Sequence, residues 1–274
     1  MKASEYLRLV ERAKSSYATL ICEYCGEETL SGSAKSFCSN CESIVSTGRA
    51  ELASRNPQLV ESMETIRSAT AAGDFDAVLY AYTELEKTSQ APQMLYCHGL
   101  AYVEYSNMFI STIRYDLNGF MEANARARDN GFKMLSEAKL LFAKSAYHSE
   151  SASLGGNTSP ELTYNRFLCL LRIGELRRAK RAIDELAAAN EHALADYANL
   201  LLHLASAEYG DAAPLADRIA RSENPPMNIF YYLAFLSFKA GKSGPLKMLS
   251  PLNGVIDPAK LRRLAEAITS ESNV

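Results

Sequence analysis

Two pairs of cysteines are the residues of this chain whose types and spacing point most clearly to chemistry. They are Cys22 and Cys25, followed after twelve residues by Cys38 and Cys41. A Cys-x-x-Cys turn brings two sulfur atoms to one side of a tight loop. Two such turns can supply the four corners of a tetrahedral zinc site. The spacing therefore predicts one zinc ion bound by four thiolates.

The number of protein ligands predicts the role of this metal. With four cysteines bound, no coordination position is left for water, and such a site is structural rather than hydrolytic. A segment this short cannot bury a core, so metal binding is expected to supply its folding free energy. The alternatives are two disulfides or a redox pair, but a redox motif would need a neighbouring βαβ pattern, which we do not find. Cys97 and Cys169 lie in apolar helical patterns and are expected in the core.

The two cysteine turns resemble the knuckles of a zinc ribbon. The first reads Cys-Glu-Tyr-Cys-Gly and the second Cys-Ser-Asn-Cys. Strands are expected at residues 28–30 and 35–37, joined by a turn at residues 31–33, so that the ribbon forms a small β-hairpin. The second knuckle departs from the family pattern at Glu42, where glycine is common.

Composition and charge place the chain among globular proteins of ordinary make-up. Its 274 residues carry a formal net charge of −3, which does not demand a nucleic-acid partner. The N-terminal residues 1–17 lack a hydrophobic signal segment, and the longest apolar run, residues 229–238, is too short to span a bilayer. Together with paired cysteines of zinc spacing, these features favour a cytoplasmic protein without a membrane partner.

Helical periodicity dominates the chain. Residues 4–20 form a candidate amphipathic helix that leads into the first knuckle, and from Pro57 onward nearly every segment repeats its apolar residues at helical spacing. A polar loop is expected at residues 149–159. The sequence thus predicts an all-α fold with strands confined to the ribbon. We expect a helix-plus-ribbon domain at residues 1–55 and a helical domain at residues 56–274.

Four similar turns suggest an internal repeat. They begin at Gly73, Gly174, Gly210 and Gly241, and each is expected between two helices, where glycine ends one helix and the next residue caps the following one. Gly-Asp-Phe-Asp-Ala at residues 73–77 resembles the turn of the tetratricopeptide repeat. The resemblance implies a TPR-like array of antiparallel helix pairs, an α-solenoid. An ordinary irregular helical bundle is the alternative.

The tetratricopeptide resemblance also implies where a partner would bind. The first helix of each pair lines a concave surface in that family, which assigns Tyr164, Asn165, Arg172, Tyr231 and Lys239 to a partner site. Aromatic side chains with an amide and cations suit an extended peptide or an acidic terminus. For the aromatic helix at residues 228–239, burial in the core is the competing interpretation.

No catalytic constellation accompanies these features. The four histidines are scattered, and no phosphate-binding loop is found. We therefore expect a non-enzymatic protein-interaction adaptor with a structural zinc site. One alternative is a transcription or translation factor that touches nucleic acid through Arg177, Arg178 and Arg181. Another is a self-assembling structural protein whose Tyr- and Phe-rich helices form a homo-oligomer interface.

Overall fold

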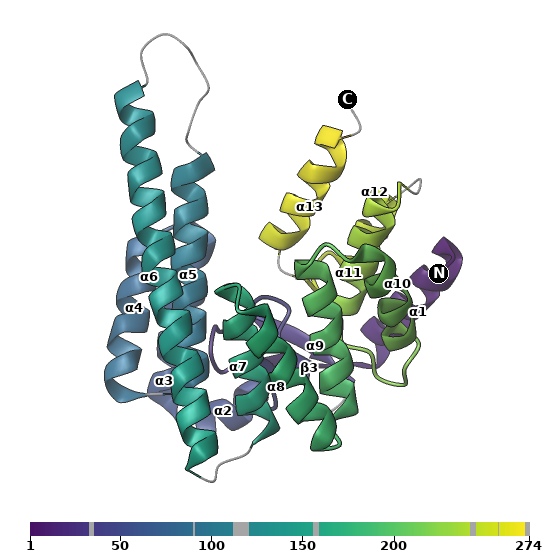
Figure 1. Cartoon of the computed structure of the whole chain (residues 1–274), viewed down its shortest axis with the longest axis horizontal. Coiled ribbons are helices and arrows are strands. Elements are labelled where there is room, and N and C mark those ends of the chain that lie inside the picture. Colours follow the sequence, from purple (N-terminus) through teal and green to yellow (C-terminus); the bar gives the residue numbers. More distant parts are fainter. Residues whose placement is uncertain are drawn as a thin grey trace. The chain divides into compact units, whose positions relative to one another are not determined.

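The computed structural model describes residues 1–32, 36–89, 91–111, 121–155, 159–241, 245–256 and 258–271 (Figure 1). Within these ranges the chain is mostly helical, and its strands form two small two-stranded sheets. Every strand in the described part of the chain lies between residues 18 and 45, around the four clustered cysteines. The expectation of an all-α body with strands confined to the cysteine region is therefore confirmed.

The N-terminal segment differs from the predicted hairpin. It consists of α1 (Ala3–Ser16), β1 (Ala18–Ile21), β2 (Glu28–Ser31), β3 (Ser36–Phe37) and β4 (Ile44–Val45). The predicted pairing of residues 28–30 with residues 35–37 is wrong, because β1 pairs with β2 and β3 pairs with β4, both antiparallel. Each Cys-x-x-Cys turn itself reverses the chain and so closes its own hairpin. The helix predicted to reach residue 20 ends at Ser16, since residues 18–20 pair in β1. Residues 33–35 of the predicted turn and strand lie outside the described ranges.

Helices occupy most of the chain after the cysteines. They are α2 (Arg49–Arg55), α3 (Pro57–Ala72), α4 (Phe75–Thr88), α5 (Pro92–Ser111), α6 (Met121–Leu154), α7 (Pro160–Arg172), α8 (Leu176–Ala188), α9 (His192–Ala205), α10 (Tyr209–Ala220), α11 (Asn228–Lys239), α12 (Pro245–Leu249), the 3-10 helix η1 (Ser250–Leu252) and α13 (Pro258–Glu271).

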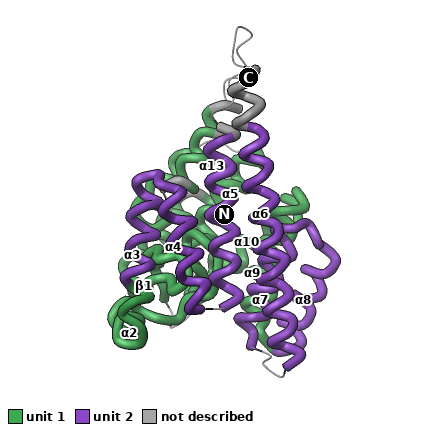
Figure 2. The backbone as a smooth tube through the Cα atoms, turned by 90° about the vertical axis from the view of Figure 1, so that its left-hand side faces the viewer, with its two compact units in different colours: residues 1–60, 190–274 green, residues 61–189 purple. Residues whose placement is uncertain are grey.

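By its contacts the chain divides into two compact units, coloured separately in Figure 2. Unit 1 comprises residues 1–60 and 190–274, and unit 2 comprises residues 61–189. In unit 2, α4 to α8 pack against one another in chain order, and in unit 1 the same holds for α9 to α12. Packing of consecutive helices is consistent with helix pairs. The expected division into residues 1–55 and 56–274 concerns independent folding and stays a prediction.

The core of unit 1 combines the beginning and the end of the described chain. Tyr6, Val10 and Ala13 of α1 are buried together with apolar residues of α9 to α13. The Tyr6 hydroxyl donates to the main-chain oxygens of Phe230 and Met248, at 3.2 and 2.7 Å. Phe230 is itself fully buried, so the aromatic helix α11 supplies core, as the competing interpretation expected.

The polar loop predicted at residues 149–159 begins later than expected. Helix α6 continues to Leu154. Ser149 is buried, and its hydroxyl, like that of Ser145, accepts a hydrogen bond of 3.0 Å from the Asn165 amide of α7. The serines therefore serve the contact between two helices rather than a loop. Residues 156–158 of the predicted loop lie outside the described ranges.

Three of the four predicted glycine turns have a left-handed glycine in the structure. Gly73, Gly174 and Gly241 have φ values of 72°, 82° and 64°, and the Asp74 carboxylate caps α4 by accepting from the Ala77 amide at 3.1 Å. Turn residues 242–244 are outside the described ranges.

The fourth predicted turn, at Gly210, is wrong. Gly210 lies in the first turn of α10, and Ala207 takes the left-handed conformation, with φ 58°. The Ala207 amide donates to the Leu204 carbonyl and the Glu208 amide to the His203 carbonyl. The same hydrogen-bond pattern closes the turn at Gly174, so an alanine occupies a glycine position here.

Because left-handed backbone costs alanine about 1–2 kcal/mol, Ala207→Gly should stabilise unit 1, by about 0.5–1 kcal/mol after the entropic cost of glycine. Gly241→Ala is the matched reverse change, since no atom lies within 4 Å of the added Cβ. It should destabilise by about 1 kcal/mol. Urea denaturation of both variants checks the two signs. A loss of stability in Ala207→Gly would contradict the assigned turn.

Candidate metal centre

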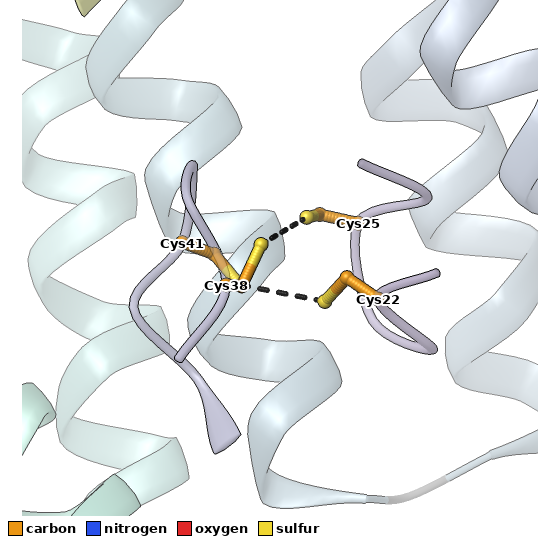
Figure 3. A group of neighbouring side chains, drawn as sticks. All are labelled: Cys22, Cys25, Cys38 and Cys41. Atoms are coloured by element: carbon orange, nitrogen blue, oxygen red, sulfur yellow. Dashed lines mark hydrogen bonds between the residues drawn. The ribbon is translucent and has the colours of Figure 1, made fainter. Parts of the chain in front are cut away.

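The two hairpins bring all four cysteine sulfurs together, as Figure 3 shows. Cys22 Sγ lies 3.6 Å from Cys41 Sγ, and Cys25 Sγ lies 3.6 Å from Cys38 Sγ, so each close pair joins one cysteine of each knuckle. All four sulfurs lie within 4.8 Å of one another, and all four residues are buried. The predicted grouping of the four cysteines is therefore present.

The sulfur separations allow a test of what the group can hold. A disulfide would place two sulfurs about 2.05 Å apart, so neither close pair is bonded. Zinc–sulfur bonds of about 2.3 Å in a tetrahedron place the sulfurs about 3.8 Å apart. The observed 3.6 Å matches a single tetrahedral metal ion. The donor set and its spacing thus fit a metal ion.

The electrostatics of the site also call for a cation. Burial raises the pKa of Cys22 well above its ordinary value, and hydrogen bonds with the other cysteines, first with Cys22, raise that of Cys25. Four buried thiolates at this spacing repel one another unless a counter-charge lies between them. A bound divalent cation supplies that counter-charge, because metal-ligating cysteines bind as thiolates.

The two knuckles share one backbone geometry. In each, the amide of the first cysteine donates to the carbonyl five residues later, and the amide four residues later donates back to the carbonyl of that cysteine. The bonds are Cys22 N to Glu27 O (2.9 Å), Gly26 N to Cys22 O (2.9 Å), Cys38 N to Ser43 O (2.9 Å) and Glu42 N to Cys38 O (3.2 Å). This matching supports the resemblance of both turns to metal-binding knuckles.

Position 42 shows what the departure from glycine does. Gly26 and Glu42 occupy equivalent knuckle positions with φ values of 75° and 63°. The left-handed conformation costs a glutamate about 1–2 kcal/mol relative to glycine. Contacts of the Glu42 side chain must offset that cost.

The Glu42 carboxylate is buried and fully surrounded by donors. One oxygen accepts from the Tyr197 hydroxyl and the Asn228 amide, each at 2.7 Å. The other accepts from the Tyr232 hydroxyl and the Lys260 ammonium, each at 2.6 Å. These partners belong to α9, α11 and α13, so one knuckle side chain joins three helices of unit 1. Sequence analysis did not identify this cluster, although the glutamate at a glycine position signalled it.

Two further contacts hold the second hairpin on unit 1. The Asn228 amide also donates to the Cys38 carbonyl at 2.9 Å, which is the main chain of a predicted metal ligand. The Phe37 ring stacks on the Tyr197 ring, with centroids 4.0 Å apart. The second cysteine hairpin therefore packs on the helices of unit 1.

The residues assigned to a partner site are not alike in their surroundings. Tyr164 and Asn165 of α7 are 1 % and 2 % exposed, which favours a core role. Arg172, at the end of α7, is exposed. Tyr231 is half-buried beside Lys260, and the exposed Lys239 lies over the ring of Phe238, 4.8 Å from its centre. Their partner-binding role stays a prediction.

The arginines of the nucleic-acid alternative lie together on α8. Arg177, Arg178 and Arg181 are all exposed, and Arg178 forms an ion pair of 3.2 Å with Glu150. Binding of nucleic acid by α8 also stays a prediction.

The remaining cysteines, Cys97 and Cys169, are buried as expected.

No protein-family model, curated protein or solved structure matches this chain. The assignments above therefore rest on its own sequence and structure. Among the described residues, no helix combines the length and apolar character needed to cross a bilayer.

Replacing any one of the four clustered cysteines by serine should abolish stoichiometric metal binding, because a buried three-thiolate site leaves the cation under-coordinated. Cys97→Ala is the matched control, since Cys97 is equally buried but lies outside the cluster. Elemental analysis of the purified proteins checks this. Retention of metal by Cys38→Ser, or its loss from Cys97→Ala, would contradict the assignment.

Proposed function

We propose that this protein is a non-enzymatic interaction adaptor, in which a four-cysteine zinc centre stabilises a helical scaffold that binds a protein partner. The observation that carries the proposal is the closed, buried donor set. When four cysteines fill a tetrahedral ion, neither water nor substrate can reach it, so the bound zinc supplies structure rather than Lewis-acid chemistry.

Zinc is the metal that suits this donor set best. Tetrahedral thiolate sites select zinc or iron–sulfur clusters. Sulfurs 3.6 Å apart leave room between them for one ion. A cluster of several iron atoms would need its cysteine ligands farther apart. Thiolate ligands persist in reducing compartments, which is consistent with a cytoplasmic protein.

Side chains around the cysteine centre connect it to the helices of unit 1. Glu42 and Asn228 connect the second knuckle to α9, α11 and α13 by hydrogen bonds. This argues for the zinc centre as a staple of unit 1 rather than as a separate recognition head. The helices carry the proposed binding role.

The binding surface is proposed on the TPR-like interpretation. Left-handed glycine turns and packing of consecutive helices support helix pairs. Arg172 and Lys239 are the exposed cations that the resemblance places on the partner-facing side. An acidic or extended peptide is the kind of segment they suit.

Charge reversal tests this assignment. Lys239→Glu and Arg172→Glu should each weaken partner capture about tenfold, because repulsion replaces attraction at the contact. Lys247→Glu on α12 is the matched control, since Lys247 is also exposed. Quantitative affinity capture from native extract, with metal-loaded protein, gives the comparison. No captured protein, or equal capture by all variants, would count against the adaptor.

A further inference from the structure

Lys260 of α13 occupies an unusual position beside the second knuckle. Its ammonium lies 2.6 Å from the Glu42 carboxylate and 3.5 Å from the Ser39 carbonyl. It also lies 4.8 and 5.2 Å from the ring centres of Tyr231 and Tyr232. The side chains of Lys260 and Glu42 are only 14 % and 5 % exposed. The knuckle and α11 thus form an acidic, aromatic cage around a cation of α13.

This cage binds its lysine more strongly than a surface ion pair would. A charge-assisted hydrogen bond and two aromatic faces act on the same ammonium, and burial reduces the screening of each. A buried carboxylate also needs its counter-ion, because an unpaired charge in the interior is costly. The Glu42–Lys260 pair therefore ties α13 to the knuckle.

The cage wall on the knuckle side depends on the cysteine centre. Glu42 follows Cys41 directly, and its amide donates to the Cys38 carbonyl. The surrounding hairpin has only two residue pairs between β3 and β4. So small a hairpin does not hold a left-handed glutamate by itself, and the metal ligands Cys38 and Cys41 that precede it fix its position.

Helix α13 otherwise rests on an apolar face. Leu261, Leu264 and Ile268 are buried in the core of unit 1. From α13, the Lys260 ammonium donates to two residues of the second knuckle, the Ser39 carbonyl and the Glu42 carboxylate. A change at the metal site can therefore reach α13 through this side-chain cluster.

We propose that the second knuckle latches α13 through Glu42 and Lys260, so that loss of metal from the four cysteines releases α13 from unit 1. This inference rests on the metal binding assigned under the proposed function. Coupling of this kind is reciprocal, so release of α13 must in turn weaken metal retention. The position of α13 then reports whether the cysteine centre is filled.

Three single variants and one double variant of the full chain test the latch. Lys260→Met keeps the length and apolar stem of the side chain but removes its charge. Glu42→Gly removes the carboxylate and gives position 42 the residue found at Gly26, so the knuckle backbone is preserved. Lys247→Met on α12 is the control for removal of an exposed lysine. The double variant combines Glu42→Gly with Lys260→Met.

Zinc content, zinc transfer to a chelating dye and amide hydrogen exchange are measured on each protein. In the wild type, chelation should raise exchange in α13 about tenfold, ahead of α10 and with α8 of unit 2 unchanged. Zinc-loaded Lys260→Met should show this fast exchange before chelation and should lose zinc several-fold faster, about threefold or more. Lys247→Met should behave as wild type, and the double variant as Glu42→Gly alone.

The outcomes separate the latch from the metal site. Wild-type protein that binds zinc but keeps α13 protected after zinc removal overturns the latch alone, as does full α13 protection in Lys260→Met. An even rise across α10 and α13 means that the metal holds unit 1 as a whole, and also overturns it. Wild-type protein purified under reducing conditions that binds no zinc overturns both the metal centre and the latch.

Discussion

Four sulfur atoms buried within 4.8 Å of one another impose the constraint on which unit 1 depends. Without a bound ion, the surrounding hairpins are held by few contacts of their own. As thiolates, the four cysteines repel one another unless a cation lies between them. A tetrahedral metal ion resolves both problems at the observed sulfur spacing. The knuckles are then rigid enough to carry side chains that must be placed accurately.

Glu42 is the side chain that makes use of this rigidity. Its left-handed backbone is unfavourable, and so is the burial of its charge. Both costs are offset by four donors, one of them the Lys260 ammonium, which come from three helices. The four-cysteine cluster is thereby connected to the helical core. This arrangement explains why the cysteine hairpins and α13 belong to one compact unit.

Local patterns in the sequence predicted the parts of the structure that local physics determines. Cysteine spacing was sufficient for the grouping of the four cysteines, and helical periodicity was sufficient for the all-α body. Segments 18–20 and 149–154 were assigned wrongly because strand pairing and buried serine contacts overrode their local pattern. The left-handed turn predicted at Gly210 lies at Ala207, because the hydrogen bonds at the helix ends set the position of the turn. The role of Glu42 was out of reach, since its partners lie 155 to 218 residues away.

X-ray absorption at the zinc edge of the purified, reduced protein tests the central claim most directly, because it reports the identity and distance of the ligand atoms. The account predicts one zinc per chain surrounded by four sulfurs at about 2.3 Å, with no lighter ligand. Nitrogen or oxygen ligands at about 2.0–2.1 Å would mean an open site or a different ligand set. That result, or protein without zinc, would contradict the closed cysteine centre.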